Sequence, residues 1–148
     1  MSSQQELEAS LRLLVALVLG IVIGTEREYF RHAAGMRTIT AVCVGSCLFT
    51  VAGSLVPHTD PTRVAAQVVT GIGFLGAGAI IRSGRSIHGL TTAAAIWVSA
   101  AIGMAVGFGD YILAVVAALL VVVALVVLQY VEDLLARFRD RFNPSPPP

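Results

Sequence analysis

Five long apolar segments, separated by short polar ones, dominate the chain. A membrane core about 30 Å thick needs about 20 apolar residues in an α-helix, which rises about 1.5 Å per residue. The pattern therefore predicts an all-α fold, an integral membrane bundle of five transmembrane helices. The expected spans are about 7–25, 37–56, 62–81, 90–108 and 111–130.

These spans form one predicted transmembrane domain over residues 1–131, followed by a short tail over 132–148. Apolar side chains recur at helical spacing between Val131 and Phe138, so the last helix could continue into the tail as an amphipathic helix. The Pro-rich end after Asn143 is expected to be disordered.

Composition supports membrane residence. Hydrophobic residues make up 56% of the 148 residues and charged residues only 13%, and the mean hydropathy is +0.82. Soluble domains carry about 25% charged residues. The sequence shows no nucleophile–base pair, metal-ligand cluster or phosphate-binding loop, so we expect no enzyme activity and no resident cofactor.

The basic residues indicate an orientation. All ten are arginine, and eight of them fall in the segments that follow the first, third and fifth spans. Cytoplasmic loops of membrane proteins carry the excess of positive charge. The distribution therefore predicts an N-terminus outside, a C-terminus in the cytoplasm, and no nucleic-acid surface.

Charged and hydroxyl side chains are predicted to gather at the cytoplasmic ends of the first four spans. This candidate polar layer consists of Glu26, Arg27, Glu28, Arg37, Thr38, Arg82, Thr91 and Thr92. It has two interpretations, an ordinary interfacial charge belt or a functional polar site. Mg²⁺ is a possible ligand of Glu26 and Glu28, because it needs only one or two carboxylates and retained water.

Two features inside the first two spans have structural interpretations. Glu8 precedes Arg12 by four residues, which is the favourable order for a helical ion pair. Cys43 and Cys47 lie four residues apart in an apolar segment and are expected to be small buried side chains.

Small residues recur in the first, third and fourth spans, where they let helix backbones approach closely. They are Gly20, Gly24, Gly71, Gly73, Gly76, Gly78, Gly103 and Gly107. Internal packing is one interpretation, and a homodimer interface at Gly20/Gly24 and Gly103/Gly107 is the other. Trp97 lies in the middle of a span, so we expect its indole N–H to find a partner inside the bundle.

Four motifs in order resemble the MgtC/SapB family of bacterial inner-membrane proteins, over roughly Leu7 to Leu128. They are Gly24-Thr-Glu-Arg-Glu28, Ala34-Gly-Met-Arg-Thr38, Gly71-Ile-Gly-Phe-Leu-Gly-Ala-Gly78, and Gly89-Leu-Thr-Thr-Ala-Ala94 with Trp97. The resemblance maps the family's charged motif onto Glu26, Arg27, Glu28 and Arg37. It maps the Gly-rich motif onto Gly71, Gly73, Gly76 and Gly78.

The resemblance implies a multi-pass protein of the bacterial cytoplasmic membrane, linked to adaptation to low magnesium and to survival inside macrophages. It further implies a non-enzymatic regulator of membrane partners such as the proton-translocating ATP synthase. A magnesium or other cation channel gated by the polar layer is the alternative. Longer family members carry a soluble C-terminal domain, and this sequence stops at Pro148, so we expect a short form without it.

Overall fold

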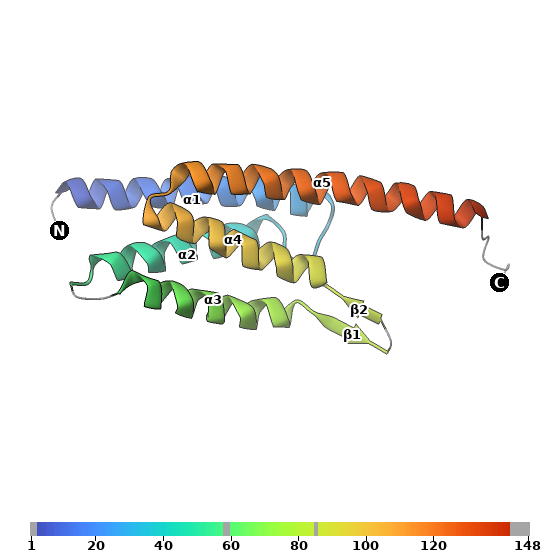
Figure 1. The fold of residues 1–148 in the computed structure, drawn as a ribbon, viewed down its shortest axis with the longest axis horizontal. Coiled ribbons are helices and arrows are strands. Elements are labelled where there is room, and N and C mark those ends of the chain that lie inside the picture. The colour runs from blue at the N-terminus through green and yellow to red at the C-terminus, as the bar shows by residue number, and fades with distance from the viewer. Residues whose placement is uncertain (1–2, 58–59, 85, 143–148) are drawn as a thin grey trace.

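The computed structural model describes residues 3–57, 60–84 and 86–142, with side chains up to Phe138. It is an all-α bundle with one short hairpin (Figure 1). The helices are α1 (Ser3–Tyr29), α2 (Met36–Leu55), α3 (Pro61–Gly78), α4 (Leu90–Phe108) and α5 (Tyr111–Phe142). The hairpin pairs β1 (Ile81–Ser83) with β2 (Ser86–His88) in antiparallel register.

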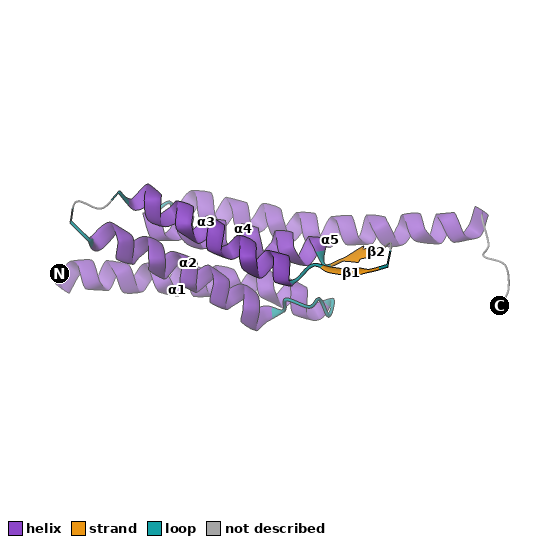
Figure 2. Ribbon diagram, turned by 90° about the horizontal axis from the view of Figure 1, so that it is seen from below, coloured by secondary structure: helices purple, strands orange, loops and turns teal. Residues whose placement is uncertain are grey.

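Four of the five described helices are long and apolar enough to cross a membrane, namely α1, α2, α4 and α5. The helix α3 is the remaining one; it lies beside α2 and α4 (Figures 1 and 2). Its sequence includes Arg63, Gln67 and Thr70, which lower its hydropathy. The membrane bundle is thus confirmed, while a fifth crossing and the orientation of the bundle stay predictions.

The helix boundaries correct three expectations. α1 continues to Tyr29, so Glu26, Arg27 and Glu28 lie in its last turns and not in a loop. α3 ends at Gly78 instead of reaching residue 81, and Arg82 belongs to β1. A two-stranded hairpin therefore replaces the expected short loop before α4.

The helix α5 runs without a break through the predicted tail boundary to Phe142. Its C-terminal part extends well past the ends of the other helices (Figure 1). The apolar side chains of this extension, Val131 to Phe138, are exposed. The predicted disordered end lies outside the described residues.

The core lies around α2 and α4, which contact each other and α1 along their lengths. Their buried faces carry small side chains, including Cys43 and Cys47, both fully buried as expected. α3 buries only Val68, Ile72 and Gly76, and so it is the least enclosed of the four helices α1 to α4. The bundle therefore has a tight centre and a loosely covered edge at α3.

Local signals explain where the helices begin. Asp60 caps α3, because its Oδ1 accepts hydrogen bonds from the Thr62 N–H at 2.9 Å and the Thr62 hydroxyl at 2.7 Å, and Pro61 fits the first turn. Gly89 precedes α4 with φ of 88°, and a Cβ there would lie 2.0 Å from the Ala79 carbonyl oxygen. Only glycine fits that junction between the hairpin and α4.

Candidate functional site

The eight residues of the predicted polar layer do lie on elements that meet at one end of the bundle. This end holds the end of α1, the starts of α2 and α4, and the hairpin (Figures 1 and 2). The structure separates them by burial, however. Glu26, Arg27 and Thr92 are buried, whereas Glu28, Arg37, Thr38, Arg82 and Thr91 are exposed.

Arg27 is the centre of the buried group. Its side chain is fully enclosed, and its Nη2 donates a hydrogen bond of 2.8 Å to the hydroxyl of Thr92. Its Nε and Nη1 have no partner among the described residues. A buried charge is costly unless it is hydrogen-bonded, so this contact fixes the end of α1 against the start of α4.

Glu26 is the second buried charged residue, with 8% of its surface exposed. Neither carboxylate oxygen has a hydrogen-bond partner among the described residues, and no ion pair to Arg27 forms within the described chain. Unpaired buried oxygens are rare in folded proteins and mark a place where water, an ion or a proton can bind. Among the described residues, no three His, Cys, Asp or Glu side chains gather around a common point.

Glu28 has a structural role that the sequence interpretation missed. Its Oε2 accepts a hydrogen bond of 3.1 Å from the backbone N–H of Met36, the first residue of α2. Gly35 leaves room for this carboxylate, since a Cβ there would lie 2.0 Å from Oε2. Glu28 at the end of α1 thus caps α2, and the signal was a carboxylate eight residues before an uncapped helix start.

The exposed members do not form a common site in this chain. Arg82 donates from Nε to the Gly84 carbonyl oxygen at 3.2 Å, within its own hairpin. Arg37 and Thr38 lie on the outer face of α2, and Thr91 lies on the outer face of α4. The candidate polar site therefore reduces to Glu26, Arg27 and Thr92.

Arg12 links the other end of the bundle. It pairs with Glu8, as the spacing predicted, and its Nη1 also donates to the Gly107 carbonyl oxygen at 2.7 Å. This second contact joins α1 to the end of α4. The sequence gives no direct signal for it beyond a glycine, which leaves its own carbonyl accessible.

Four of the eight predicted glycines pack against α2. A Cβ on Gly20 would lie 2.8 Å from the Thr40 Cα, and one on Gly24 would lie 2.6 Å from the Met36 Cα. On α4, a Cβ on Gly103 would lie 2.1 Å from the Cys43 carbonyl oxygen, and one on Gly107 would lie 2.6 Å from the Thr50 Cβ. The internal-packing interpretation is confirmed, and the expectation that these pairs form a dimer interface is wrong, because another helix of the same chain already covers them.

The glycines of α3 differ from these four. A Cβ on Gly76 would lie 3.7 Å from the Ala93 Cβ on α4, but Gly71, Gly73 and Gly78 have no atom within 4 Å of the position of an added Cβ. They lie on faces of α3 that no other described residue covers. Small residues at these positions therefore make no close packing contact with the described part of the chain.

Trp97 corrects a further expectation. Its side chain is 52% exposed on the outer face of α4, not enclosed in the bundle. It lines a shallow groove of about 450 Å³ between α4 and α5, together with Thr91, Ala94, Val98 and Leu125. Its indole N–H has no partner within the described residues.

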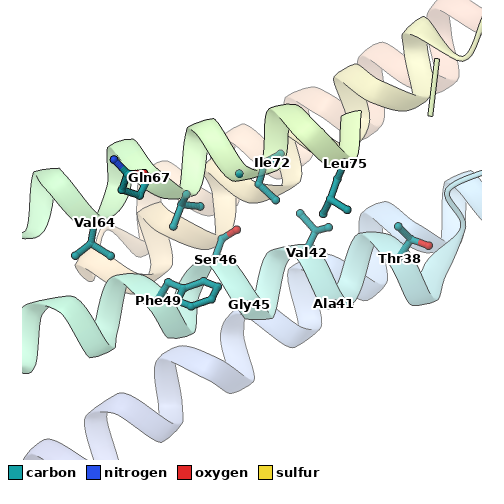
Figure 3. A pocket seen from close by; sticks show the side chains of 12 residues that line it. Thr38, Ala41, Val42, Gly45, Ser46, Phe49, Val64, Gln67, Ile72 and Leu75 are labelled. Carbon is teal, nitrogen blue, oxygen red and sulfur yellow. The ribbon is translucent and has the colours of Figure 1, made fainter. Parts of the chain in front are cut away.

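A second groove, of about 580 Å³, lies between α2 and α3. Its walls are apolar apart from Thr38, Ser46 and Gln67, and Figure 3 shows Ser46 directed into the space between the two helices. Gly45 and Gly71 line it, and no atom lies within 4 Å of where a Cβ on either glycine would be. The described residues thus form one groove between α2 and α3 and another between α4 and α5.

Comparison with known proteins identifies the family of this chain. A model of the MgtC family matches residues 13–134. The chain belongs to the MgtC family. It is 42% identical over 119 residues to Protein MgtC of Salmonella typhimurium, a match that covers 80% of this chain and 52% of that protein.

Other MgtC relatives are similar to the same extent. Protein MgtC of Brucella abortus is 44% identical over 134 residues, covering 88% of this chain and 56% of that protein. An uncharacterised Synechocystis protein is 45% identical over 123 residues, covering 82% and 53%. The chain spans about half the length of these relatives, and no solved structure matches it.

Proposed function

We propose that this MgtC-family chain is a non-enzymatic regulator of the bacterial cytoplasmic membrane that acts by binding a transmembrane helix of another membrane protein. The physiological setting is adaptation to low magnesium, with the proton-translocating ATP synthase as one candidate partner. Family membership supports the setting, and the exposed Trp97 groove supports the mode of action.

The observation that carries the proposal is the exposure of Trp97. In a lipid environment its indole N–H has no hydrogen-bond acceptor, and such a group is costly there. A helix lying in the α4–α5 groove supplies both an acceptor and a surface for the ring. Tryptophan is also the residue type most enriched at the energetic centre of protein interfaces.

The walls of the groove fit an incoming helix. Thr91, Ala94 and Val98 are small or β-branched and lie on the same side of α4 as Trp97. Small side chains let a neighbouring helix approach closely, and a threonine hydroxyl can hydrogen-bond across the contact. The groove therefore offers one aromatic anchor and a close-packing surface.

The test is affinity purification of the tagged chain from its native membrane in mild detergent. Membrane proteins enriched by the wild-type chain should be lost with Trp97→Ala and reduced with Trp97→Phe, which keeps a ring but removes the N–H. Leu48→Ala is the matched control, because Leu48 is exposed to a similar degree, 50% against 52% for Trp97, but lies on α2 and lines neither groove. Equal enrichment by all three variants refutes the assignment to this groove.

One observation favours the second candidate, a magnesium or other cation pathway. Glu26 is buried with both carboxylate oxygens unpartnered, and carboxylates are the side chains that Mg²⁺ prefers. The neighbouring Arg27 opposes cation binding at this point. This candidate requires a flux that depends on Glu26, and the two proposals are separated by that dependence.

A further inference from the structure

α3 presents an exposed stripe that no other described part of the chain covers. Its members recur every three or four residues and so lie on one face of the helix. They are Arg63, Gln67, Gly71, Phe74 and Gly78. Phe74 is 81% exposed, and the other four are exposed as well.

Contact with lipid acyl chains is energetically unfavourable for this stripe. Gly71 and Gly78 leave backbone uncovered, and Gln67 carries an amide that hydrocarbon cannot hydrogen-bond. In membrane proteins, glycines and amide side chains in this arrangement are typical of helix–helix contacts. The stripe is therefore better suited to packing against a protein surface than to facing lipid.

An independent observation comes from α2. Ser46 is 2% exposed, and it lines the groove beside the stripe. Elsewhere in the bundle, Thr50 and Ser99 donate their hydroxyls to the carbonyl oxygen four residues earlier, at 2.8 and 2.7 Å. The Ser46 hydroxyl makes no such bond within the described residues and is directed toward α3 (Figure 3). An unpartnered hydroxyl that is directed into a groove can hydrogen-bond a polar group from outside, which an acyl chain cannot supply.

We infer that the stripe on α3 and the groove beside it form the self-association surface of this protein, and that the occupant is α3 of a second copy. A two-fold dimer brings the same patch of both copies together, so the patch must complement itself. An amide both donates and accepts, so Gln67 at the same depth in both copies can pair across the axis or bond the partner's Ser46.

Charge complementarity selects a second copy over an unrelated helix. At the start of α3, Asp60 and Arg63 lie three residues apart, both are exposed, and no ion pair joins them within the described chain. A parallel two-fold arrangement places Arg63 of each copy beside the partner's Asp60. The N-terminal end of the paired patch then carries two acids and two bases, and it has no net charge.

This surface is separate from the Trp97 groove, so the inference does not rest on the proposed regulatory function. The inference places the dimer contact on α3, whereas the glycine pattern alone had suggested α1 and α4. Gly20, Gly24, Gly103 and Gly107 are used inside the chain, whereas Gly71 and Gly78 remain for a second copy.

Cysteine cross-linking of the full chain in its membrane tests the surface. Gly71→Cys lies on the stripe, and Gly73→Cys lies about 200° further round the same helix, at about 100° per residue. Both positions have open space around them, so neither substitution disturbs the fold. The unmodified chain is the blank, because Cys43 and Cys47 are fully buried.

We expect oxidation to give a covalent dimer with Gly71→Cys and little with Gly73→Cys. In detergent, Gly71→Leu should shift the molecular mass from two copies to one, while Gly73→Leu should stay at two. Equal cross-linking at both positions overturns the inference. So does a wild-type monomer, whether free or carrying a bound lipid in the groove.

Discussion

Replacing Gly103 with alanine tests the packing of α4 on α2 most sharply. The added Cβ would lie 2.1 Å from the Cys43 carbonyl oxygen and 2.9 Å from its carbon, in a wall made of backbone. Ordinary contact begins at 3.4 Å, so the two helices must move apart by about 1 Å. No flexible side chain can yield instead, because the clash is with the main chain of α2.

The expected cost follows from overpacking. An extra carbon in a tightly packed core costs about 1–3 kcal/mol. Alanine also favours the helix over glycine by up to about 1 kcal/mol, which offsets part of the loss. We therefore expect Gly103→Ala to lower the free energy of unfolding by up to about 2 kcal/mol in total.

Gly73→Ala is the matched control, since it makes the same chemical change at a helical glycine with no atom within 4 Å. It should leave stability unchanged or raise it by up to about 1 kcal/mol. Unfolding in mixed micelles of increasing denaturing detergent can be followed by the fluorescence of the single tryptophan, Trp97. If both variants unfold at the same detergent fraction, the account of the α2–α4 seam is wrong.

Three further predictions concern polar contacts. Thr92→Val removes the acceptor of the enclosed Arg27 and should cost about 1–3 kcal/mol in unfolding free energy, whereas Thr92→Ser should cost less. Glu28→Ala removes the cap of Met36 and should cost about 0.5–2 kcal/mol, with faster amide exchange at the start of α2 and Glu28→Gln as the milder control. Hydrogen bonds from Thr62 hold the pKa of Asp60 below its ordinary value of 3.8. The contribution of this cap to the stability of α3 is therefore complete above pH 3.8 and is lost as the pH falls through the lowered pKa. Amide exchange at the start of α3 should therefore speed up in acid, and Asp60→Asn should abolish that change.

Much of the fold follows from the sequence, because a bilayer admits few backbone structures. The helices fall where the apolar segments do, and Pro61 and Gly109 stand at ends that the structure reproduces. The hairpin after α3 was missed. Its strands have only three residues each, and their side chains are exposed, so no buried alternation marks them.

The contents of the candidate site were harder to predict, because position in sequence does not give the rotation of a helix about its axis. Glu26, Arg27 and Glu28 are consecutive but have different surroundings. Glu26 has unpartnered carboxylate oxygens, Arg27 is fully enclosed, and Glu28 caps α2. Each successive residue turns about 100° around a helix. Which of the three faces α4 depends on contacts that the local sequence does not encode.

The exposure of Trp97 could have been anticipated. Gly103 and Gly107 define the side of α4 that packs on α2, and steps of three or four residues back from them reach Ser99, Ile96 and Thr92. All of these are buried. Trp97 falls outside that series and so belongs to the outer face, which mean hydropathy alone does not reveal.

The central claim is that the chain acts on a membrane partner and does not itself carry ions. The most direct test is Mg²⁺ flux into proteoliposomes containing the wild-type chain or Glu26→Gln, with an Mg²⁺-sensitive dye inside. The circular dichroism of the helices confirms that the vesicles hold folded protein. The account predicts no saturable flux above empty vesicles for either chain. A saturable flux that falls with Glu26→Gln would contradict it and identify the buried carboxylate as part of a cation pathway.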